Sequence, residues 1–396
     1  MKSKQLLILC IVAVALLAAG IVMNRSKSRS WQGQSTGGKV LPTLDAAKVG
    51  KFVVQNAKGT VTVEFKDDLW RVAERYGYPA KFETLATFLE DLAALTVTQR
   101  VAAGESQYGR LKLNDPGQDD AGSLLTVFGQ DGSETAALIF GKEHLRKGND
   151  SDPMGRGGFA DGRYLRTKGG TDVILVAKSF SQIDDQPNSW LDDQFFKLSD
   201  IQEASLSAGG EILWTASRAD KSAELQLAGE VPEGKEVDAT KLGGIKNAFS
   251  WARFSDVADP ALKPEDTGFD QAKTFVAKQF DGTAYTVTVG KKGADGKYYL
   301  AVKADYAGPT ERVAAEGEKP EDKETLDKAF AATLAEVQKK VADLNARTQN
   351  WVYLVDAWTV ESVTKSRDEL LKDKPKPKEE AATPPAGAVE GAAAQE

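Results

Sequence analysis

One pattern occurs twice in this chain, and it limits the possible folds more than any other feature of the sequence. Residues 131–142 read Asp-Gly, an apolar run and Gly-Lys, and residues 281–291 repeat that order. A Tyr-Leu pair beside a basic residue follows each copy, at 162–165 and again at 296–300. Because 396 residues exceed one ordinary hydrophobic core, the repetition predicts an α+β protein made of two homologous repeats.

The first repeat, at 44–198, is expected to form a mainly antiparallel sheet with one amphipathic helix packed on it. Alternating apolar residues on both sides of Lys58-Gly59 predict a hairpin, and residues 69–72 predict a third strand. Apolar residues at three- and four-residue spacing predict the helix: Phe82, Leu85, Phe88, Leu89, Leu92 and Leu95. Further strands are predicted at 124–128, 135–140, 164–166 and 172–176.

The second repeat, at 199–372, follows the same order of elements. A hairpin is predicted around Gly209-Gly210, and residues 267–270 take the place that 111–114 have in the first repeat. The closing strand at 351–355 matches the last strand of the first repeat. A shorter helical stripe consists of Leu242, Ile245, Phe249 and Trp251.

The second repeat also contains an insertion at 309–350, which is expected to be helical. Pro320 suits a first helical turn, because its missing N–H would have no partner there anyway. Apolar residues then recur with heptad-like spacing: Phe330, Leu334, Val337, Val341 and Leu344. Two interpretations are open: the helix lies on its own sheet, or it docks another helix.

The N-terminus predicts a transmembrane anchor at 1–25. Residues 6–23 are uncharged and would span about 27 Å as a helix, close to the thickness of the hydrocarbon core. A cleavable signal peptide is the alternative, because small residues occur within the run. Leu9 precedes Cys10, which lies early in the run, and this disfavours lipoprotein processing. A flexible stalk rich in Ser and Gly is predicted at 26–43.

Composition bears on the location of the chain and on its partners. The Pro-rich tail at 373–396 is predicted to be disordered, because it cannot bury enough apolar surface to offset its ordering entropy. The net charge is −7, and the first 29 residues carry five bases and no acids, so the remainder carries −12. An acidic body repels phosphate backbones, which argues against a nucleic-acid partner. We expect a single-pass protein of the inner membrane with its bulk on the periplasmic side.

Short motifs join these elements in a recurring order: the anchor, the hairpin, the Trp70 strand, the leucine-striped helix, turns at 108–116 and 268–270, and a closing strand at 352–355. This order resembles a bacterial family described only as domain of unknown function 4340. Such proteins are typically encoded beside components of gliding-motility-type ABC transporters. The resemblance implies an accessory partner of an ABC-2-type membrane complex, and it brings no catalytic residues.

No set of side chains marks a catalytic, cofactor or metal site, and none is predicted. His144 is the only histidine, and it is expected to be a solvated loop residue rather than a general base. Four short motifs resemble catalytic or ligand-binding patterns but are better explained by local structure. Residues 33–37 belong to the predicted stalk, 149–152 to a loop and 155–158 to a turn, and residues 362–365 cap a helix. Four tryptophans are expected to be core anchors: Trp70, Trp214, Trp251 and Trp351.

These features predict a non-enzymatic, membrane-anchored extracytoplasmic protein that acts as an accessory or scaffold partner of a membrane complex, such as an ABC-2-type transporter. The expected partners are membrane-protein subunits and the membrane itself, and no cofactor is expected. Two alternatives are open. One is a module that binds a cell-envelope glycan or small ligand, and the other is a hydrolase that depends on carboxylates alone.

Overall fold

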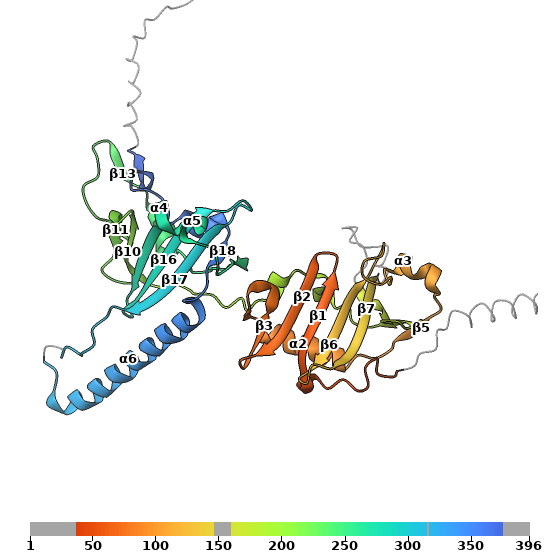
Figure 1. The fold of residues 1–396 in the computed structure, drawn as a ribbon. Coiled ribbons are helices and arrows are strands. Elements are labelled where there is room, and N and C mark those ends of the chain that lie inside the picture. Colours follow the sequence, from red (N-terminus) through yellow and green to blue (C-terminus); the bar gives the residue numbers. More distant parts are fainter. Residues whose placement is uncertain (1–36, 146–159, 315–316, 375–396) are drawn as a thin grey trace, which may run out of the picture. The chain divides into compact units, whose positions relative to one another are not determined.

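The computed structural model describes residues 37–145, 160–314 and 317–374 (Figure 1). Helices combine with mainly antiparallel sheets, which is the fold class that the sequence predicted. The described chain divides into two compact units.

Several predicted features lie outside the described residues. They are the anchor at 1–25, most of the stalk, the motifs at 149–152 and 155–158, and the tail beyond Lys374. Among the residues that the structure does describe, no helix is both long enough and apolar enough to cross a membrane.

Unit 1 contains the described chain up to Phe195, together with Arg253–Leu262 and Trp351–Val355. Its large sheet has nine strands in the order β4-β3-β2-β1-β6-β7-β8-β9-β5, and neighbouring strands are antiparallel. The predicted hairpin is confirmed, and Gly59 in its turn has a φ of 133° that side chains other than glycine rarely adopt. The strands of the nine-stranded sheet are β1 (Val49–Asn56), β2 (Gly59–Lys66), β3 (Leu69–Val72), β4 (Tyr78–Pro79), β5 (Gln99–Val101), β6 (Ser123–Gly129), β7 (Glu134–Leu145), β8 (Ala160–Thr167) and β9 (Val173–Val176). The short strands β14 (Asp256–Val257) and β18 (Tyr353–Val355), which pair with each other, do not belong to this sheet.

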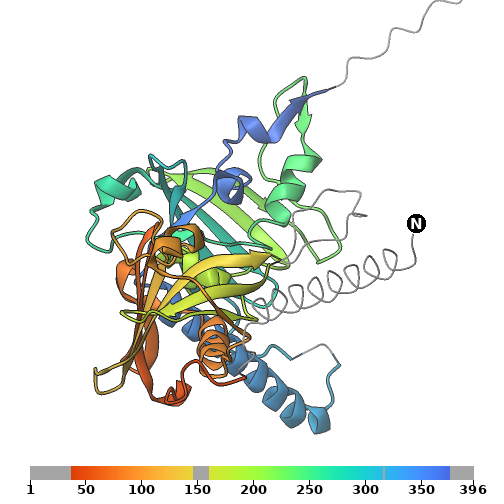
Figure 2. The same ribbon diagram turned by 90° about the vertical axis from the view of Figure 1, so that its right-hand side faces the viewer.

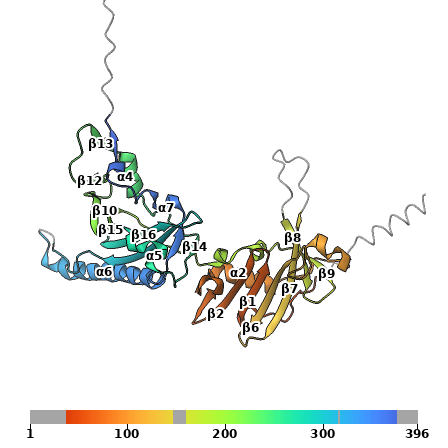
Figure 3. The same cartoon turned by 45° about the horizontal axis from the view of Figure 1, so that its top comes forward.

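The amphipathic helix α2 (Phe82–Ala93) packs on this sheet (Figure 3). Four residues of the predicted stripe are buried within it: Leu85, Phe88, Leu89 and Leu92. The Phe88 ring lies 5.3 Å from the rings of both Phe52 and Trp190. The prediction was wrong for Phe82, which is 68% exposed. Helical side chains lean towards the N-terminus, so a side chain in the first turn points beyond the helix.

Two arginines of β8 are buried, although arginine normally faces solvent. The Arg163 guanidinium donates to the main-chain oxygen of Phe180 at 3.2 Å and to the Asp184 carboxylate at 2.7 Å. The Arg166 guanidinium donates twice to the main-chain oxygen of Leu113, at 3.1 and 3.0 Å. Each guanidinium connects a loop to the sheet, and these hydrogen bonds offset the cost of burying its charge.

Arg163 holds the start of a return segment, 179–194, which runs back towards the first turn of α2. The side-chain amide of Asn56 holds the middle of this segment through two hydrogen bonds to main-chain oxygens, each 2.9 Å long. Near its end, the main-chain N–H of Lys81 donates to the oxygen of Trp190 at 2.9 Å. The last residues of the segment therefore lie beside the N-terminus of α2.

Unit 2 contains a second antiparallel sheet, in which six strands run in the order β12-β11-β10-β15-β16-β17. The predicted hairpin around Gly209-Gly210 is confirmed by the pairing of β10 with β11. The strands are β10 (Ile201–Ala208), β11 (Glu211–Ser217), β12 (Gln226–Leu227), β15 (Lys273–Gln279), β16 (Thr283–Lys292), β17 (Tyr298–Tyr306) and the separate pair β13 (Lys235–Val237) and β19 (Leu371–Asp373). The short helices are α4 (Ala239–Lys246), α5 (Pro264–Thr267) and α7 (Ala357–Glu361).

The tryptophans that were expected in the core have different environments. Trp214 is 2% exposed and its indole N–H donates to a main-chain oxygen at 2.8 Å, so the prediction is confirmed there. Trp251 is 79% exposed, because α4 ends before it and the expected stripe does not continue. Trp70 and Trp351 are only half-buried.

The long helix α6 (Pro320–Thr348) begins at the predicted residue (Figure 2). Near its C-terminus Leu344 and Thr348 are buried. The Asn345 amide accepts from the main-chain N–H of Ala304 in β17 at 2.9 Å and donates to the oxygen of the same residue at 2.7 Å. At this end the helix lies on its own sheet. The remaining apolar residues of the seam are half-buried: Phe330, Leu334, Val337 and Val341.

The Gly-Lys step that occurs twice in the sequence has the same packing in each unit. A Cβ added to Gly141 in β7 would lie 2.4 Å from the main-chain oxygen of Leu111, the last residue of α3 (Tyr108–Leu111). A Cβ added to Gly290 in β16 would lie 2.2 Å from the main-chain oxygen of Thr267, the last residue of α5. Neither distance leaves room for a side chain, so both positions require glycine.

The substitution Gly141→Ala tests this contact. It is expected to lower the free energy of unfolding by about 1–3 kcal/mol, because the added methyl group overpacks the site. The control is Gly243→Ala in α4, where an added Cβ would meet nothing within 4 Å and alanine favours the helix by about 1 kcal/mol. Urea unfolding of the full chain, followed by circular dichroism, measures both. Unchanged stability of the Gly141→Ala protein would contradict the packing.

Candidate functional site

Three aromatic side chains are presented at one edge of unit 1. Phe65 of β2 and Trp70 of β3 pair across the hairpin, with ring centroids 5.6 Å apart. The turn between them consists of Asp67 and Asp68, whose φ angles of 50° and 59° are tolerated by aspartate better than by most residues. Phe82, at the start of α2, is the third aromatic residue. The hairpin turn and the helix start together keep these rings at the surface.

These three aromatic residues border two adjoining pockets, of about 520 and 410 Å³. Because both pockets share them, we treat the pockets as one surface and call it the aromatic groove. The larger pocket has a mainly apolar lining that includes Ala46, Ala47, Val49, Leu85, Ala86 and Leu89. The smaller pocket extends to the end of the return segment, where residues 192–194 form part of its wall.

The charged residues along the aromatic groove are almost all acidic. Six carboxylates line the two pockets: Asp45, Asp68, Glu83, Glu90, Asp192 and Asp193. Among the lining residues Lys81 is the single base, and its ammonium donates to Asp193 at 2.9 Å. That hydrogen bond raises the pKa of the Lys81 ammonium above its ordinary value. The groove therefore has an apolar floor and an excess of negative charge around it.

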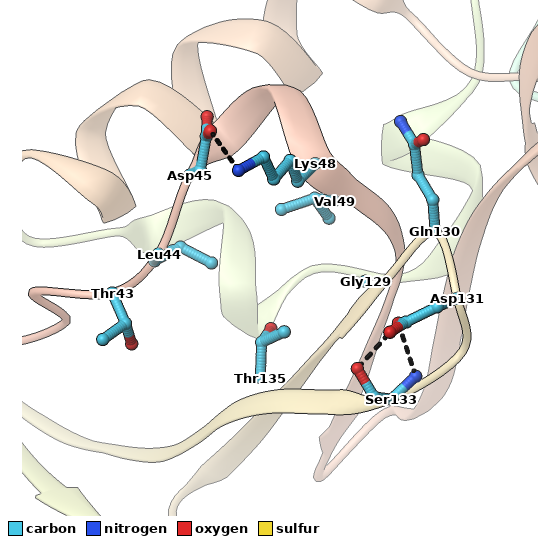
Figure 4. A pocket seen from close by; sticks show the side chains of 10 residues that line it. All are labelled: Thr43, Leu44, Asp45, Lys48, Val49, Gly129, Gln130, Asp131, Ser133 and Thr135. Atoms are coloured by element: carbon cyan, nitrogen blue, oxygen red, sulfur yellow. Dashed lines mark hydrogen bonds and ion pairs between the residues drawn. The ribbon is translucent and has the colours of Figure 1, made fainter.

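A third pocket, of about 470 Å³, lies between the start of the described chain and the turn that joins β6 to β7 (Figure 4). Several of its polar groups are already paired with one another. Lys48 lies 3.6 Å from Asp45, and both the main-chain N–H and the hydroxyl of Ser133 donate to Asp131. These hydrogen bonds lower the pKa of the Asp131 carboxyl. A ligand site needs polar groups that converge on open space, so this pocket is the weaker candidate.

The residues that the sequence singled out for chemistry do not form a site. His144 lies in β7 rather than in a loop, because β7 continues past Phe140 and stays paired with β8. Its Nδ1 is 2.6 Å from the Asp161 carboxylate, and the pair is partly exposed to solvent. The motif at 362–365 was expected to begin a helix, but it follows α7 and Ser362 is the C-cap. In the described ranges, no group of three or more His, Cys, Asp and Glu side chains could hold a metal ion.

Inspection of the sequence missed the aromatic groove. Its lining comes from positions between Asp45 and Gln194, and only the folded chain brings them together. One local signal was present. A two-residue Asp-Asp turn would place Phe65 and Trp70, which precede and follow it, on the same face of a hairpin.

The fold and the groove define a class: a two-unit, mainly antiparallel protein with an open apolar surface bordered by acids. The family model for a domain of unknown function (DUF4340) matches residues 70–272, just over half of the chain. The chain belongs to this family, as the resemblance in its sequence implied. No curated protein and no solved structure matched the chain.

The substitution Phe82→Ser tests whether the groove is open to apolar ligands. It is expected to reduce binding of the neutral dye Nile red to the full-length protein, because it removes an exposed ring that borders both pockets. Stability should stay within about 0.5 kcal/mol of the wild type, since the side chain lies on the surface. Ile212→Ser in unit 2, where the residue is 71% exposed, is the control. Fluorescence titration that gives equal losses for both variants would argue against a distinct groove.

Proposed function

We propose that this protein is a non-enzymatic accessory subunit that binds a membrane-protein partner on the extracytoplasmic side of the inner membrane. The observation that carries the proposal is the aromatic groove, whose floor is apolar and whose border is charged. Exposed apolar patches with a polar rim are typical of protein interaction sites. An ABC-2-type transporter is the partner class that the family resemblance suggests.

The side chains of the groove favour binding over catalysis. General acid–base catalysis needs a proton donor or acceptor aimed at a reacting atom, and nucleophilic catalysis needs a nucleophile beside its base. In the groove, Lys81 and Asp193 are already bonded to each other. Asp68, Glu83 and Glu90 are exposed at the rim, where water screens their charge. This arrangement suits recognition of a charged partner.

As part of this proposal, the two units descend from one duplicated domain. Six strands of unit 1, in the order β3-β2-β1-β6-β7-β8, correspond in order to β12-β11-β10-β15-β16-β17 of unit 2. The first strand of each long hairpin has a register shift at the same place, at 49–51 and at 201–203. The Ser133 N–H donates to Asp131 as the Thr283 N–H donates to Asp281. The twin glycine contacts described above support the same origin.

The proposed location depends on the sequence. An uncharged run at 6–23 with basic residues on both sides suits a single membrane-spanning anchor, and the stalk at 26–43 would hold the two units at the membrane surface. A binding surface on unit 1 would then lie within reach of the extracytoplasmic parts of a neighbouring membrane protein.

Site-specific photocrosslinking in native membranes tests the proposal. A photoreactive phenylalanine analogue at position 82 of the full-length chain is expected to crosslink to a membrane protein, which mass spectrometry identifies. The same analogue at position 212, an exposed site in unit 2, is the matched control. An absence of crosslinks from position 82, or the same set of proteins captured from both positions, would contradict the proposed function.

A further inference from the structure

We infer that the aromatic groove binds a cationic amphipathic peptide segment, in which apolar side chains alternate with lysine or arginine. The inference rests on the proposed function, which assigns a protein partner to the groove without giving the chemistry of that partner. Three properties of the groove lead to it: the apolar floor, the charge of the rim and the exposure of the aromatic rings.

The floor of the groove has the size and polarity to receive apolar side chains. Its two pockets measure about 520 and 410 Å³ and meet at Phe65, Trp70 and Phe82. Leu85 and Leu89 of α2, both almost fully buried, line the larger pocket. A leucine or phenylalanine side chain of a partner would be removed from water there, and this is the main source of affinity in helix-in-groove and similar complexes.

Two carboxylates of the rim already have a basic neighbour. Lys81 donates to Asp193 at 2.9 Å, and Lys48 lies 3.6 Å from Asp45. Because a base already balances their charge, these two carboxylates attract a cationic partner only weakly.

Three other rim carboxylates have no ion-paired base in the described part of the chain, although the charge of Glu83 acts on Lys81. Asp68, Glu83 and Glu90 are exposed, and within the described part of the chain their side chains take no part in a hydrogen bond or ion pair. They lie at the β2–β3 turn, at the start of α2 and near its end, so they border the groove from more than one element. A partner that places cations between its apolar residues would complement all three.

The exposed aromatic rings also favour a positively charged partner. Phe65 is 47% exposed and Phe82 is 68% exposed, so an ammonium or guanidinium group can reach part of each side chain. The protein makes this contact within itself at other places: the Lys51 ammonium lies 4.9 Å from the Phe128 ring centroid. A basic segment can therefore use both the carboxylates and the rings.

The acidic rim disfavours the other ligands that an aromatic surface attracts. Anionic lipid headgroups and envelope polymers that carry phosphate or carboxylate groups would be repelled. A neutral glycan could stack on the rings, but it would leave the carboxylates without a counter-charge. Of these classes, the cationic peptide is the one that complements both the floor and the rim.

The test uses the full-length protein in nanodiscs of neutral lipid, with empty nanodiscs as the background. The probes are two synthetic peptides of equal length with the same helical stripe of leucines, one with lysine and the other with glutamate at the remaining positions. The leucine–lysine peptide is expected to bind, and the leucine–glutamate peptide is not. Higher salt is expected to weaken the binding, because the rim is exposed to solvent.

A triple neutralised protein (Asp68→Asn, Glu83→Gln and Glu90→Gln) is expected to bind the leucine–lysine peptide about tenfold more weakly, the size expected from the loss of three surface charges. The matched control neutralises three exposed acids of unit 2 (Glu211→Gln, Glu230→Gln and Glu233→Gln) and is expected to bind like the wild type. Circular dichroism and unfolding curves establish that both proteins are folded.

Three outcomes would overturn the inference: equal binding of the two peptides, equal losses in the two triple variants, or binding of a soluble peptidoglycan fragment that depends on Phe82 but not on the three carboxylates. The last outcome would assign the groove to a glycan. The crosslinking experiment distinguishes a failure of this inference from a failure of the proposed function. If position 82 captures the same membrane protein in the triple neutralised protein as in the wild type, the proposed function holds and the inference about charge fails.

Discussion

The buried guanidinium of Arg163 is the contact on which the groove-bearing side of unit 1 depends. At 3% exposure, this charge is stable only because its N–H groups donate to main-chain oxygens and to Asp184. Those bonds set the point at which the return segment leaves the sheet. The same segment ends in Asp192 and Asp193, which form the acidic wall of the groove. A residue of β8 thereby anchors the start of a segment whose end lines a surface that the residue does not touch.

The groove is also built on rigid elements. Phe65 and Trp70 are fixed by a two-residue turn between paired strands, and Phe82 is fixed by the first turn of a helix whose buried face packs against Phe52. A partner that binds here would not need to order a loop first, which lowers the entropic cost of association. Rigid aromatic anchors beside adaptable surface carboxylates are a common division of roles at recognition surfaces.

The sequence predicts the local elements of this fold better than it predicts the site. Period-two and helical patterns are local, so both long hairpins, the buried face of α2 and the start of α6 could be predicted. The exposure of Phe82 could not be predicted, because periodicity identifies the apolar face of a helix but not where the residues that cover this face end. The burial of Arg163 and Arg166 has no local signal in the sequence, since the main-chain oxygens that they bind are distant along the chain. The groove likewise depends on tertiary packing, apart from the Asp-Asp turn that pairs Phe65 with Trp70.

The contact between Asn345 and β17 has a further consequence. Strands with unpaired main-chain groups tend to recruit strands from other molecules, and this is a usual route to aggregation and amyloid. By offering both an acceptor and a donor to Ala304, the amide of Asn345 imitates the main chain of a neighbouring strand. That position of β17 is thereby closed to an incoming chain. One side chain on a helix thereby protects this position of the strand against exchange with a strand of another molecule.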